Sequence, residues 1–239
     1  MYYFNPVRLV FGSLVRKKIL EECVGKSVLI ICSSTAYDRY AKDPELSAIF
    51  SLAKVEFEHG FESNPSLTDI IEISHKHRDS SFDLIIGIGG GSAMDVAKIL
   101  SVSISAIKKD ININDLLRDS TFFSHFKEID CIQVPTTAGT GSEVTPFATV
   151  WDYESQQKKS LSHPMMFAKK AFIDPDFLSC MPLEVSISTG LDALNQAFES
   201  IWNVNANIFT RQLSRRAAVL ALKGLPLIKE VADDHELRD

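Results

Sequence analysis

The sequence predicts an α/β protein, in which a Rossmann-like domain built on a parallel sheet is followed by the start of an all-helical domain. Two observations predict this class. Short apolar runs typical of buried strands alternate with stretches of helical spacing along most of the chain. After Asp174-Pro175 the alternation stops, and the rest of the chain has helical spacing with no strand-like run between the helices.

The first part of the chain supplies the sheet. Four apolar runs rich in branched residues are the expected strands, namely Ser27–Cys32, Lys54–Phe57, Leu84–Ile88 and Cys131–Val134. Helical spacing between them predicts helices over Tyr37–Ala53 and Thr68–His77. Strands and helices that alternate in this way form parallel sheets with crossover helices.

The last part of the chain is expected to be helical over Glu184–Trp202 and Thr210–Ala232. We therefore predict an α/β domain over residues 1–180 and the beginning of a helical domain over residues 181–239. The second part has about 60 residues, near the lower limit for an independent core, and we expect it to be incomplete. Apolar residues at helical spacing predict self-association or poor solubility of the chain, and they are Ile187, Leu191, Leu194, Phe198 and Ile201. A homo-oligomer is also expected.

Composition excludes several classes of protein. The chain has 239 residues, a formal charge of -6 and no basic stripe with interleaved aromatic residues, which argues against a nucleic-acid partner. No apolar stretch is long enough to span a membrane. The four cysteines are scattered, and without a signal peptide they predict a reduced, cytoplasmic protein.

Three consecutive glycines, Gly89 to Gly91, lie between the third predicted strand and a helix. Ser92 offers a hydroxyl at the expected N-cap position, and the helix begins after it. A glycine turn into a helix N-terminus directs free backbone N–H groups and a positive dipole end at one point, which favours a phosphate. The alternative is a tight turn that holds no ligand, although one glycine would serve for that purpose.

A second loop of small residues, Pro135 to Glu143, follows the fourth predicted strand. Taken alone, it is as well explained by a solvated Thr/Gly loop as by a loop that wraps a phosphate or sugar. In a parallel sheet, however, loops at the carboxyl ends of strands share one crevice. The two loops together therefore predict a dinucleotide site.

Several long segments resemble the iron-containing (group III) alcohol dehydrogenase family. GGGSAMDVAK, PTTAGTGSEVT and IDPDF followed by STGLDAL stand in the order of that family, and the likeness begins at FNPVRLVFG. The resemblance implies an NAD(P)-binding α/β domain, a helical domain, a divalent metal (iron or zinc) between them, and a small alcohol or aldehyde substrate.

The resemblance also implies roles for individual residues. The cofactor pyrophosphate would be held by Gly89, Gly90, Gly91 and Ser92. The phosphate and nicotinamide-ribose side would be lined by Thr136, Thr137, Gly139 and Thr140. Asn64 matches an Asn-Pro loop near the nucleotide, and Lys158 matches a lysine beside the nicotinamide ribose, unless it is an ordinary solvated lysine. Asp95 is expected to cap or brace its helix rather than to touch ligand.

One departure from the family concerns the choice of cofactor. Many members have an aspartate after the second strand that accepts hydrogen bonds from the adenosine ribose. Ser33 stands at the matching position here, unless the alignment is shifted by one residue and hides the acid. A small hydroxyl leaves room for a 2′-phosphate and can donate to it, so NADP is expected to bind at least as well as NAD.

The second departure concerns the metal. The family pattern Gly-x-Asp-Ala-x-x-His places two ligands four residues apart on one helix face. Asp192 is present, but Gln196 replaces the histidine, and an amide oxygen is a poorer ligand than imidazole for iron or zinc. The family's two later histidines have no counterpart before Asp239. His235 is expected to be solvated, and the other five histidines match no family position.

These residues predict an NAD(P)-dependent alcohol dehydrogenase or aldehyde reductase. The segment GLDALNQAFESIWNVNAN is also similar to a subgroup of phosphonoacetaldehyde reductases, which implies a small phosphonate aldehyde as substrate. Two alternatives stay open. One is a nucleotide-binding remnant without metal-dependent turnover. The other is a metal-dependent lyase of the dehydroquinate synthase type, but the sequence PTTAGTGSE has the alcohol dehydrogenase form and argues against it.

Overall fold

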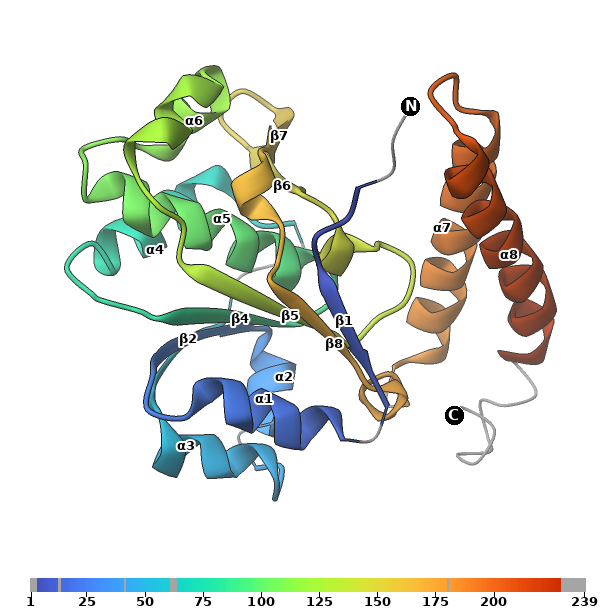
Figure 1. The fold of residues 1–239 in the computed structure, drawn as a ribbon, viewed down its shortest axis with the longest axis horizontal. Helices are drawn as coiled ribbons and strands as arrows, with labels where there is room; N and C mark the ends of the chain where they lie inside the picture. Colours follow the sequence, from blue (N-terminus) through green and yellow to red (C-terminus); the bar gives the residue numbers. More distant parts are fainter. Residues whose placement is uncertain (1–3, 13, 41, 61–63, 180, 229–239) are drawn as a thin grey trace. The chain divides into compact units, whose positions relative to one another are not determined.

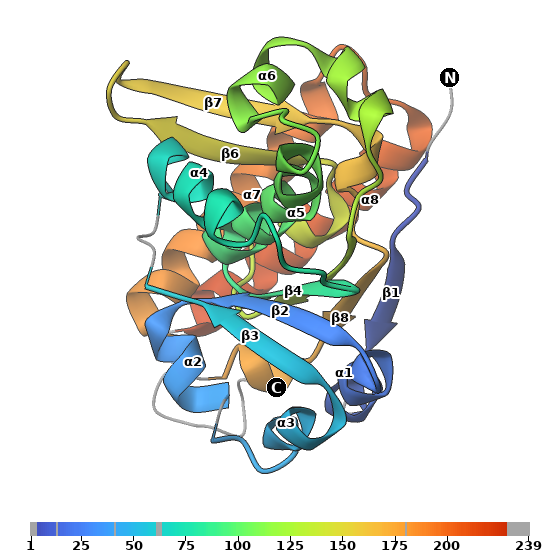
Figure 2. The ribbon, with the colours of Figure 1, turned by 90° about the vertical axis from the view of Figure 1, so that its left-hand side faces the viewer.

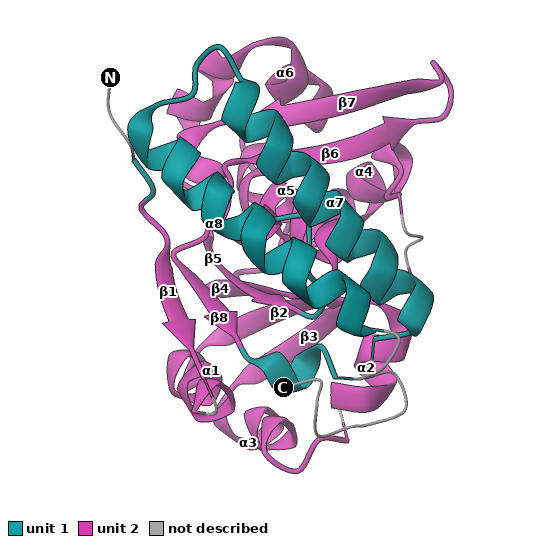
Figure 3. Ribbon diagram, turned by 90° about the vertical axis from the view of Figure 1, so that its right-hand side faces the viewer, with its two compact units in different colours: residues 1–5, 136–141, 174–239 teal, residues 6–135, 142–173 magenta. Residues whose placement is uncertain are grey.

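The computed structural model describes residues 4–228 except 13, 41, 61–63 and 180, and its chain separates into two compact units. The larger unit comprises residues 6–135 and 142–173, and the smaller comprises residues 1–5, 136–141 and 174–239. Figure 3 colours them separately. The predicted boundary near residue 180 stays a prediction.

A six-stranded parallel sheet forms the larger unit, with the strand order β1-β8-β5-β4-β2-β3. Its strands are β1 (Arg8–Phe11), β2 (Ser27–Cys32), β3 (Lys54–Glu58), β4 (Leu84–Gly89), β5 (Asp130–Pro135) and β8 (Lys170–Ile173). This sheet confirms the predicted α/β class, and the four predicted strands are β2 to β5. The strands β1 and β8 were not predicted.

Helices cover both faces of the sheet, as Figures 1 and 2 show. One face carries α1 (Val15–Cys23), α2 (Ser34–Tyr40) and α3 (Ile49–Leu52). The other carries α4 (Leu67–Lys76), α5 (Gly91–Ile107) and α6 (Ile113–Arg118), together with an antiparallel hairpin of β6 (Phe147–Asp152) and β7 (Gln157–Ser162). Among the helices described, none is long and apolar enough to cross a membrane.

The strand order reverses between β2 and β4. From β2 the chain moves outward to β3, then returns to the other side of β2 for β4 and continues to β5. Cys32, the last residue of β2, pairs with Ile88 of β4, so the carboxyl ends of these two strands lie side by side. Such a reversal is where doubly wound sheets bind their ligands.

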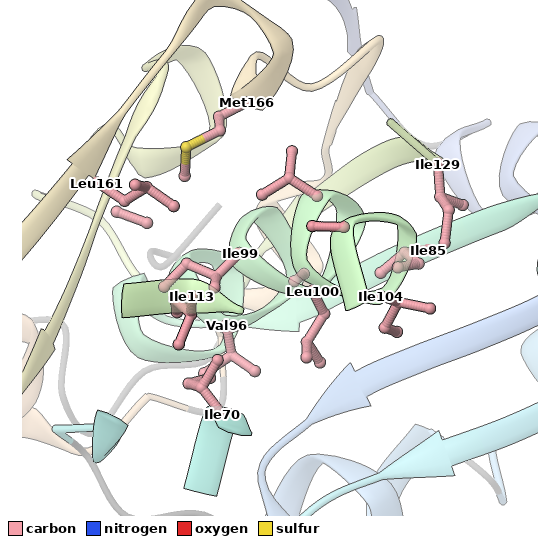
Figure 4. Close-up of a cluster of buried hydrophobic side chains, with 14 of the residues drawn as sticks. Ile70, Ile85, Val96, Ile99, Leu100, Ile104, Ile113, Ile129, Leu161 and Met166 are labelled. Carbon is pink, nitrogen blue, oxygen red and sulfur yellow. The ribbon is translucent and has the colours of Figure 1, made fainter. Parts of the chain in front are cut away.

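The main core lies between the sheet and α5 (Figure 4). Every residue of β4 is buried, which explains its continuous apolar run. Helix α5 packs against β4, α4 and β6, and most of its seventeen residues are buried. Val96, Leu100 and Ile104 belong to this cluster with Ile85 of β4. The helix that follows the glycine loop is therefore held rigidly on the sheet.

The prediction of one helix over Tyr37–Ala53 is wrong. Helix α2 ends at Tyr40, and a short 3-10 turn precedes α3. Asp43 accepts hydrogen bonds from the backbone N–H groups of Glu45 and Leu46, both at 2.9 Å, and so begins a new turn. The following Pro44 also disfavours helical backbone at Asp43.

Two helices, α7 (Leu183–Trp202) and α8 (Ile208–Gly224), make up most of the smaller unit and pack against each other. Asn207 caps α8 by accepting from the N–H groups of Phe209 and Thr210 at 2.9 and 3.0 Å. The predicted helix over Thr210–Ala232 corresponds to α8, and its last four residues lie outside the described part of the chain.

Candidate functional site

The glycine loop joins β4 directly to α5. Gly90 is the N-cap of α5, with extended backbone (φ -76°, ψ -173°) and no side-chain cap, and the helix begins at Gly91. The prediction that Ser92 is the N-cap is therefore wrong, and Ser92 lies in the first turn. The three glycines let the helix start earlier, so that its first N–H groups are flanked by residues without side chains.

This loop has the geometry of an anion cradle. The first N–H groups of α5 belong to Gly91, Ser92 and Ala93, and within the described residues no side chain caps them. Gly89 has φ +153°, and a Cβ there would lie 2.7 Å from the Cβ of Ala93. Only glycine fits at Gly89. The arrangement suits a phosphate group at the end of a long, buried helix.

Ser33 lies beside this cradle in the sheet, because it directly follows Cys32, the partner of Ile88. Its Oγ accepts from the N–H of Ala36 at 3.1 Å, so the hydroxyl proton can donate elsewhere. A shift of the alignment by one residue would place Cys32 or Ser34 here, and neither is acidic. The first carboxylate after β2 is that of Asp38, within α2.

Asn64 and Lys158 are brought near each other by β6. The backbone N–H of Trp151 donates to the carbonyl of Pro65 at 3.0 Å, and Trp151 is paired with Lys158 across the hairpin. Lys158 is exposed. Asn64 lines a hollow of about 480 Å³ whose other lining residues include Glu58, Asp69 and Glu72. These carboxylates disfavour a phosphate in that hollow, so Asn64 suits an uncharged part of a ligand.

An ion pair on α5 was not recognised in the sequence. Lys98 is fully buried, and its Nζ lies 3.1 Å from Oδ1 of Asp95 and 3.0 Å from the carbonyl oxygen of Ser142. Burial lowers the pKa of Lys98, and the charge of Asp95 opposes that shift. The signal in the sequence was a lysine within the apolar run Val96 to Leu100. Asp95 braces the fold, as expected.

The loop of Thr136, Thr137, Gly139 and Thr140 belongs to the smaller unit, together with α7. Gly139 has φ +99°, and a Cβ there would lie 2.5 Å from the carbonyl oxygen of Thr189 and 3.3 Å from Oδ2 of Asp192. The structure thus places this Thr/Gly loop directly against the face of α7 that carries Asp192. Neither the contact nor the need for glycine there was predicted.

Asp192 and Gln196 share one face of α7, as their spacing predicts. The Nε2 of Gln196 donates to Oδ2 of Asp192 at 2.8 Å, so the amide nitrogen rather than the oxygen faces the carboxylate. In the described part of the chain, no group of three or more His, Cys, Asp and Glu side chains is arranged to hold a metal ion. These residues do not fit an iron or zinc site of three or more protein ligands.

The described histidines are all in the larger unit, and three of them contact other side chains there. His77 bonds Glu58, with Nε2 2.6 Å from Oε1, while the ring of His59 stacks on Tyr37 and that of His163 stacks on Phe123. His235 lies outside the described residues, as does Cys180. The other three cysteines are buried and form no disulfide bond among the described residues.

The predicted site residues therefore form two groups. Ser33, Asn64, Gly89, Gly90, Gly91, Ser92 and Lys158 are in the larger unit, and Thr136, Thr137, Gly139, Thr140, Asp192 and Gln196 are in the smaller one. A family model described as iron-containing alcohol dehydrogenase matches residues 6–175. The chain belongs to this family. The match confirms the resemblance seen in the glycine and threonine motifs.

Similar proteins agree with this membership in the iron-containing alcohol dehydrogenase family. Aldehyde-alcohol dehydrogenase 2 of Entamoeba histolytica is 38% identical over 164 residues, which are 66% of this chain and 18% of that protein. An iron-containing alcohol dehydrogenase from Thermotoga maritima has a similar structure, with a TM-score of 0.84 and 30% identity, covering 99% of this chain and 64% of that one.

A third similar protein is sulfoacetaldehyde reductase from Bifidobacterium kashiwanohense, whose structure is a complex with NAD+. Its TM-score is 0.82 and its identity 26%, over 99% of this chain and 62% of that one. The chain thus spans less than two thirds of the length of each of these three proteins.

Proposed function

We propose that this chain binds a nicotinamide dinucleotide at the carboxyl ends of β2 and β4, as the cofactor-binding part of an alcohol dehydrogenase or aldehyde reductase. The observation that carries the proposal is the cradle from Gly89 to Ser92, which lies where the strand order reverses. When bound, the nicotinamide ring carries the hydride between alcohol and aldehyde.

The chain's own residues would bind and orient this cofactor. The N–H groups at the start of α5 would hold the pyrophosphate, and Gly89 and Gly90 would let it approach the backbone. Thr136, Thr137 and Thr140 offer hydroxyl donors for the phosphate and nicotinamide-ribose side, and Lys158 offers an ammonium group for the ribose. Gly139 keeps the Thr/Gly loop close to α7.

Ser33 is the basis for the choice of cofactor. A hydroxyl at this position accommodates and donates to the 2′-phosphate of NADP, whereas a carboxylate would repel it. We therefore propose that NADP binds at least as tightly as NAD. The NAD+ complex of the sulfoacetaldehyde reductase shows that a similar protein accepts NAD.

The proposed substrate is a small aldehyde or the corresponding alcohol. The segment from Gly190 to Asn207 suggests an aldehyde that bears a phosphonate group. The similarity to sulfoacetaldehyde reductase supports an anionic aldehyde, because a sulfonate is an anion of similar size.

A second candidate function is a nucleotide-binding chain without metal-dependent turnover. The hydrogen bond between Gln196 and Asp192 favours this candidate, because it occupies the carboxylate that would hold the metal. The third candidate, a lyase of the dehydroquinate synthase type, is disfavoured by the match to the alcohol dehydrogenase family over residues 6–175.

Titration with NADPH and NADH, followed by nicotinamide fluorescence, tests the proposed function. The unaltered chain should bind both, with NADPH at least as tight. Gly90→Val should weaken binding by at least roughly tenfold, because a branched side chain would occupy the place of the pyrophosphate. Gly90 has φ -76°, which any residue adopts, so the variant should keep its fold.

Gly224→Ala is the matched control, since a Cβ there meets no atom within 4 Å, and its affinity should be unchanged. Equal affinity of Gly90→Val and the unaltered chain would overturn the cradle. A clear preference for NADH would overturn the argument from Ser33.

A further inference from the structure

Helix α5 carries an ion pair whose side chains are not part of the proposed dinucleotide cradle. The positive partner, Lys98, is fully buried in the main core. Its Nζ donates to the carbonyl oxygens of Ser142 and Phe147 and lies 3.1 Å from Oδ1 of Asp95. The carbonyl and hydroxyl oxygens of Thr145 also accept from Nζ, at 3.5 and 3.4 Å, so all three protons of the ammonium group have acceptors.

The negative partner is equally engaged. One carboxylate oxygen of Asp95 accepts from the hydroxyl of Ser142 at 2.6 Å, and the other accepts from the backbone N–H of Thr149 at 3.0 Å. Together the two side chains bind the chain from Ser142 to Thr149 through Ser142, Thr145, Phe147 and Thr149. The first half of this segment is a short 3-10 turn and irregular chain, which has no sheet partner of its own.

The segment that the ion pair holds follows the Thr/Gly loop without a break. Pro135, immediately before that loop, is paired with Gly89 of the cradle through β5 and β4. Ser142, immediately after it, is held by the side chains of Asp95 and Lys98. Both ends of the six-residue loop are thus fixed to the elements that form the cradle.

We propose that Asp95 and Lys98 are positioning residues for dinucleotide binding, which fix the exit of the loop from Thr136 to Gly141 at Ser142. This inference rests on the proposed function. A loop with both ends fixed loses less conformational entropy when it closes on a ligand, so more of the contact energy appears as affinity. A charged pair suits this task better than an apolar one, because its hydrogen bonds are directional and hold irregular backbone.

Three variants and one control test the proposal. Asp95→Asn removes the charge but keeps the shape, Ser142→Ala removes a single hydroxyl, and Lys98→Met removes all donors at similar length. Thr149→Val is the control, because it loses only the hydroxyl, which bonds Oγ of Ser160, and keeps the N–H that donates to Asp95. If Lys98→Met does not fold, Asp95→Asn and Ser142→Ala decide the question.

Hydrogen exchange of residues 136–149 without nucleotide is the first measurement. It should be faster in Asp95→Asn and Ser142→Ala, and unchanged in Thr149→Val. The second is the dissociation constant for NADPH, which should rise by roughly tenfold in Asp95→Asn and less in Ser142→Ala. Unchanged exchange, or faster exchange with an unchanged dissociation constant, would overturn the proposal.

The pH profile separates positioning from a general loss of stability. Besides Asp95 on its own helix, the titratable groups that act on Lys98 are Cys131 of β5 and Glu143. Asp95→Asn removes the main charge that opposes desolvation, so the variant should lose the ammonium, and then affinity, at a lower pH than the unaltered chain does. The affinity of the unaltered chain should persist to higher pH, and identical pH profiles of the two proteins would contradict the proposal.

The two proposals fail in different ways. If the unaltered chain binds no dinucleotide, the proposed function fails, while hydrogen exchange still shows whether the ion pair fixes the loop. If the unaltered chain binds but the variants bind equally well, only the positioning role fails.

Discussion

Gly87, in the middle of β4, shows how a single missing side chain shapes the site. A Cβ there would lie 2.5 Å from Oε1 of Gln133 and 2.8 Å from the Cβ of Ala97. Gln133 is buried in β5, and its Nε2 donates to the carbonyl of Met94 in the first turns of α5 at 3.2 Å. The glycine therefore lets α5, and with it the cradle, sit close to the sheet.

We predict that Gly87→Ala lowers the free energy of unfolding by about 1–3 kcal/mol, because the added methyl group overpacks the interface between β4 and α5. Urea unfolding followed by circular dichroism measures this. The control is Gly224→Ala at the end of α8, which should be neutral or slightly stabilising. Equal stability of Gly87→Ala and the unaltered chain would contradict the packing argument.

At the same scale, the sequence predicted the cradle but not its supports. The glycine run was visible because a turn between a strand and a helix needs one glycine at most, and three in succession indicate a close approach to the backbone. The ion pair of Asp95 and Lys98 was not visible, because an acid followed three residues later by a base is ordinary on a helix. Its partners lie more than forty residues away in the chain, and periodicity carries no information about such contacts.

Among the elements, the hairpin of β6 and β7 is closed by a charged turn. Asp152 lies 2.7 Å from Nζ of Lys159 and accepts from the N–H groups of Glu154 and Ser155, both at 3.1 Å. The bond to Lys159 and those in the turn lower the pKa of Asp152 from its usual 3.8. A lowered carboxyl pKa stabilises the fold above the unfolded pKa, and this contribution is lost as pH falls through the folded value.

We therefore predict that Asp152→Asn is less stable than the unaltered chain at pH 7, and that the difference shrinks as pH falls below about 4. Unfolding curves at a series of pH values give the difference. Lys158→Gln is the control, because Lys158 carries the same charge as Lys159 but projects from the opposite face of β7, and it should leave the pH profile unchanged. A difference that stays constant down to about pH 2 would contradict the assignment.

The pair α7–α8 exposes large apolar side chains, as its predicted stripe indicated. Leu191 of that stripe is 52% exposed, and Trp202 and Ile208 are 66% and 70% exposed. Burial of such side chains is favourable. We predict that the chain self-associates, and light scattering over a range of concentrations measures it. A stable monomer at high concentration would contradict the prediction, and Leu191→Glu should reduce the association.

The sequence predicted those helices and strands whose burial requires a regular pattern of apolar residues. The strands β2 to β5 lie inside the sheet or pair with a buried strand, and β2, β4 and β5 have nearly continuous apolar runs. Of the strands that were missed, β6 has six residues, two of them buried, whereas the others are short or exposed. β1 is an edge strand of four residues, β8 has four, and most residues of β7 are exposed. Helix α7 was predicted almost to the residue, because twenty residues of regular spacing give a strong signal.

For the whole molecule, the family motifs that this chain keeps predict binding of the dinucleotide, and its departures from the family predict weak binding of the metal. The cradle in the larger unit is the site that we propose for the dinucleotide. Among the described residues, no three His, Cys, Asp and Glu side chains are grouped to hold a metal, and Asp192 has the neutral amide of Gln196 beside it. The central claim is that this chain holds a dinucleotide without a stoichiometric iron or zinc ion.

Metal content by mass spectrometry, measured with NADPH consumption on a panel of small aldehydes, tests that claim most directly. We predict saturable NADPH binding, iron and zinc well below one per chain, and no metal-dependent consumption of NADPH. Gln196→His should not restore turnover, because a catalytic metal needs three or more protein ligands. One metal ion per chain together with steady turnover by the unaltered chain would contradict the account.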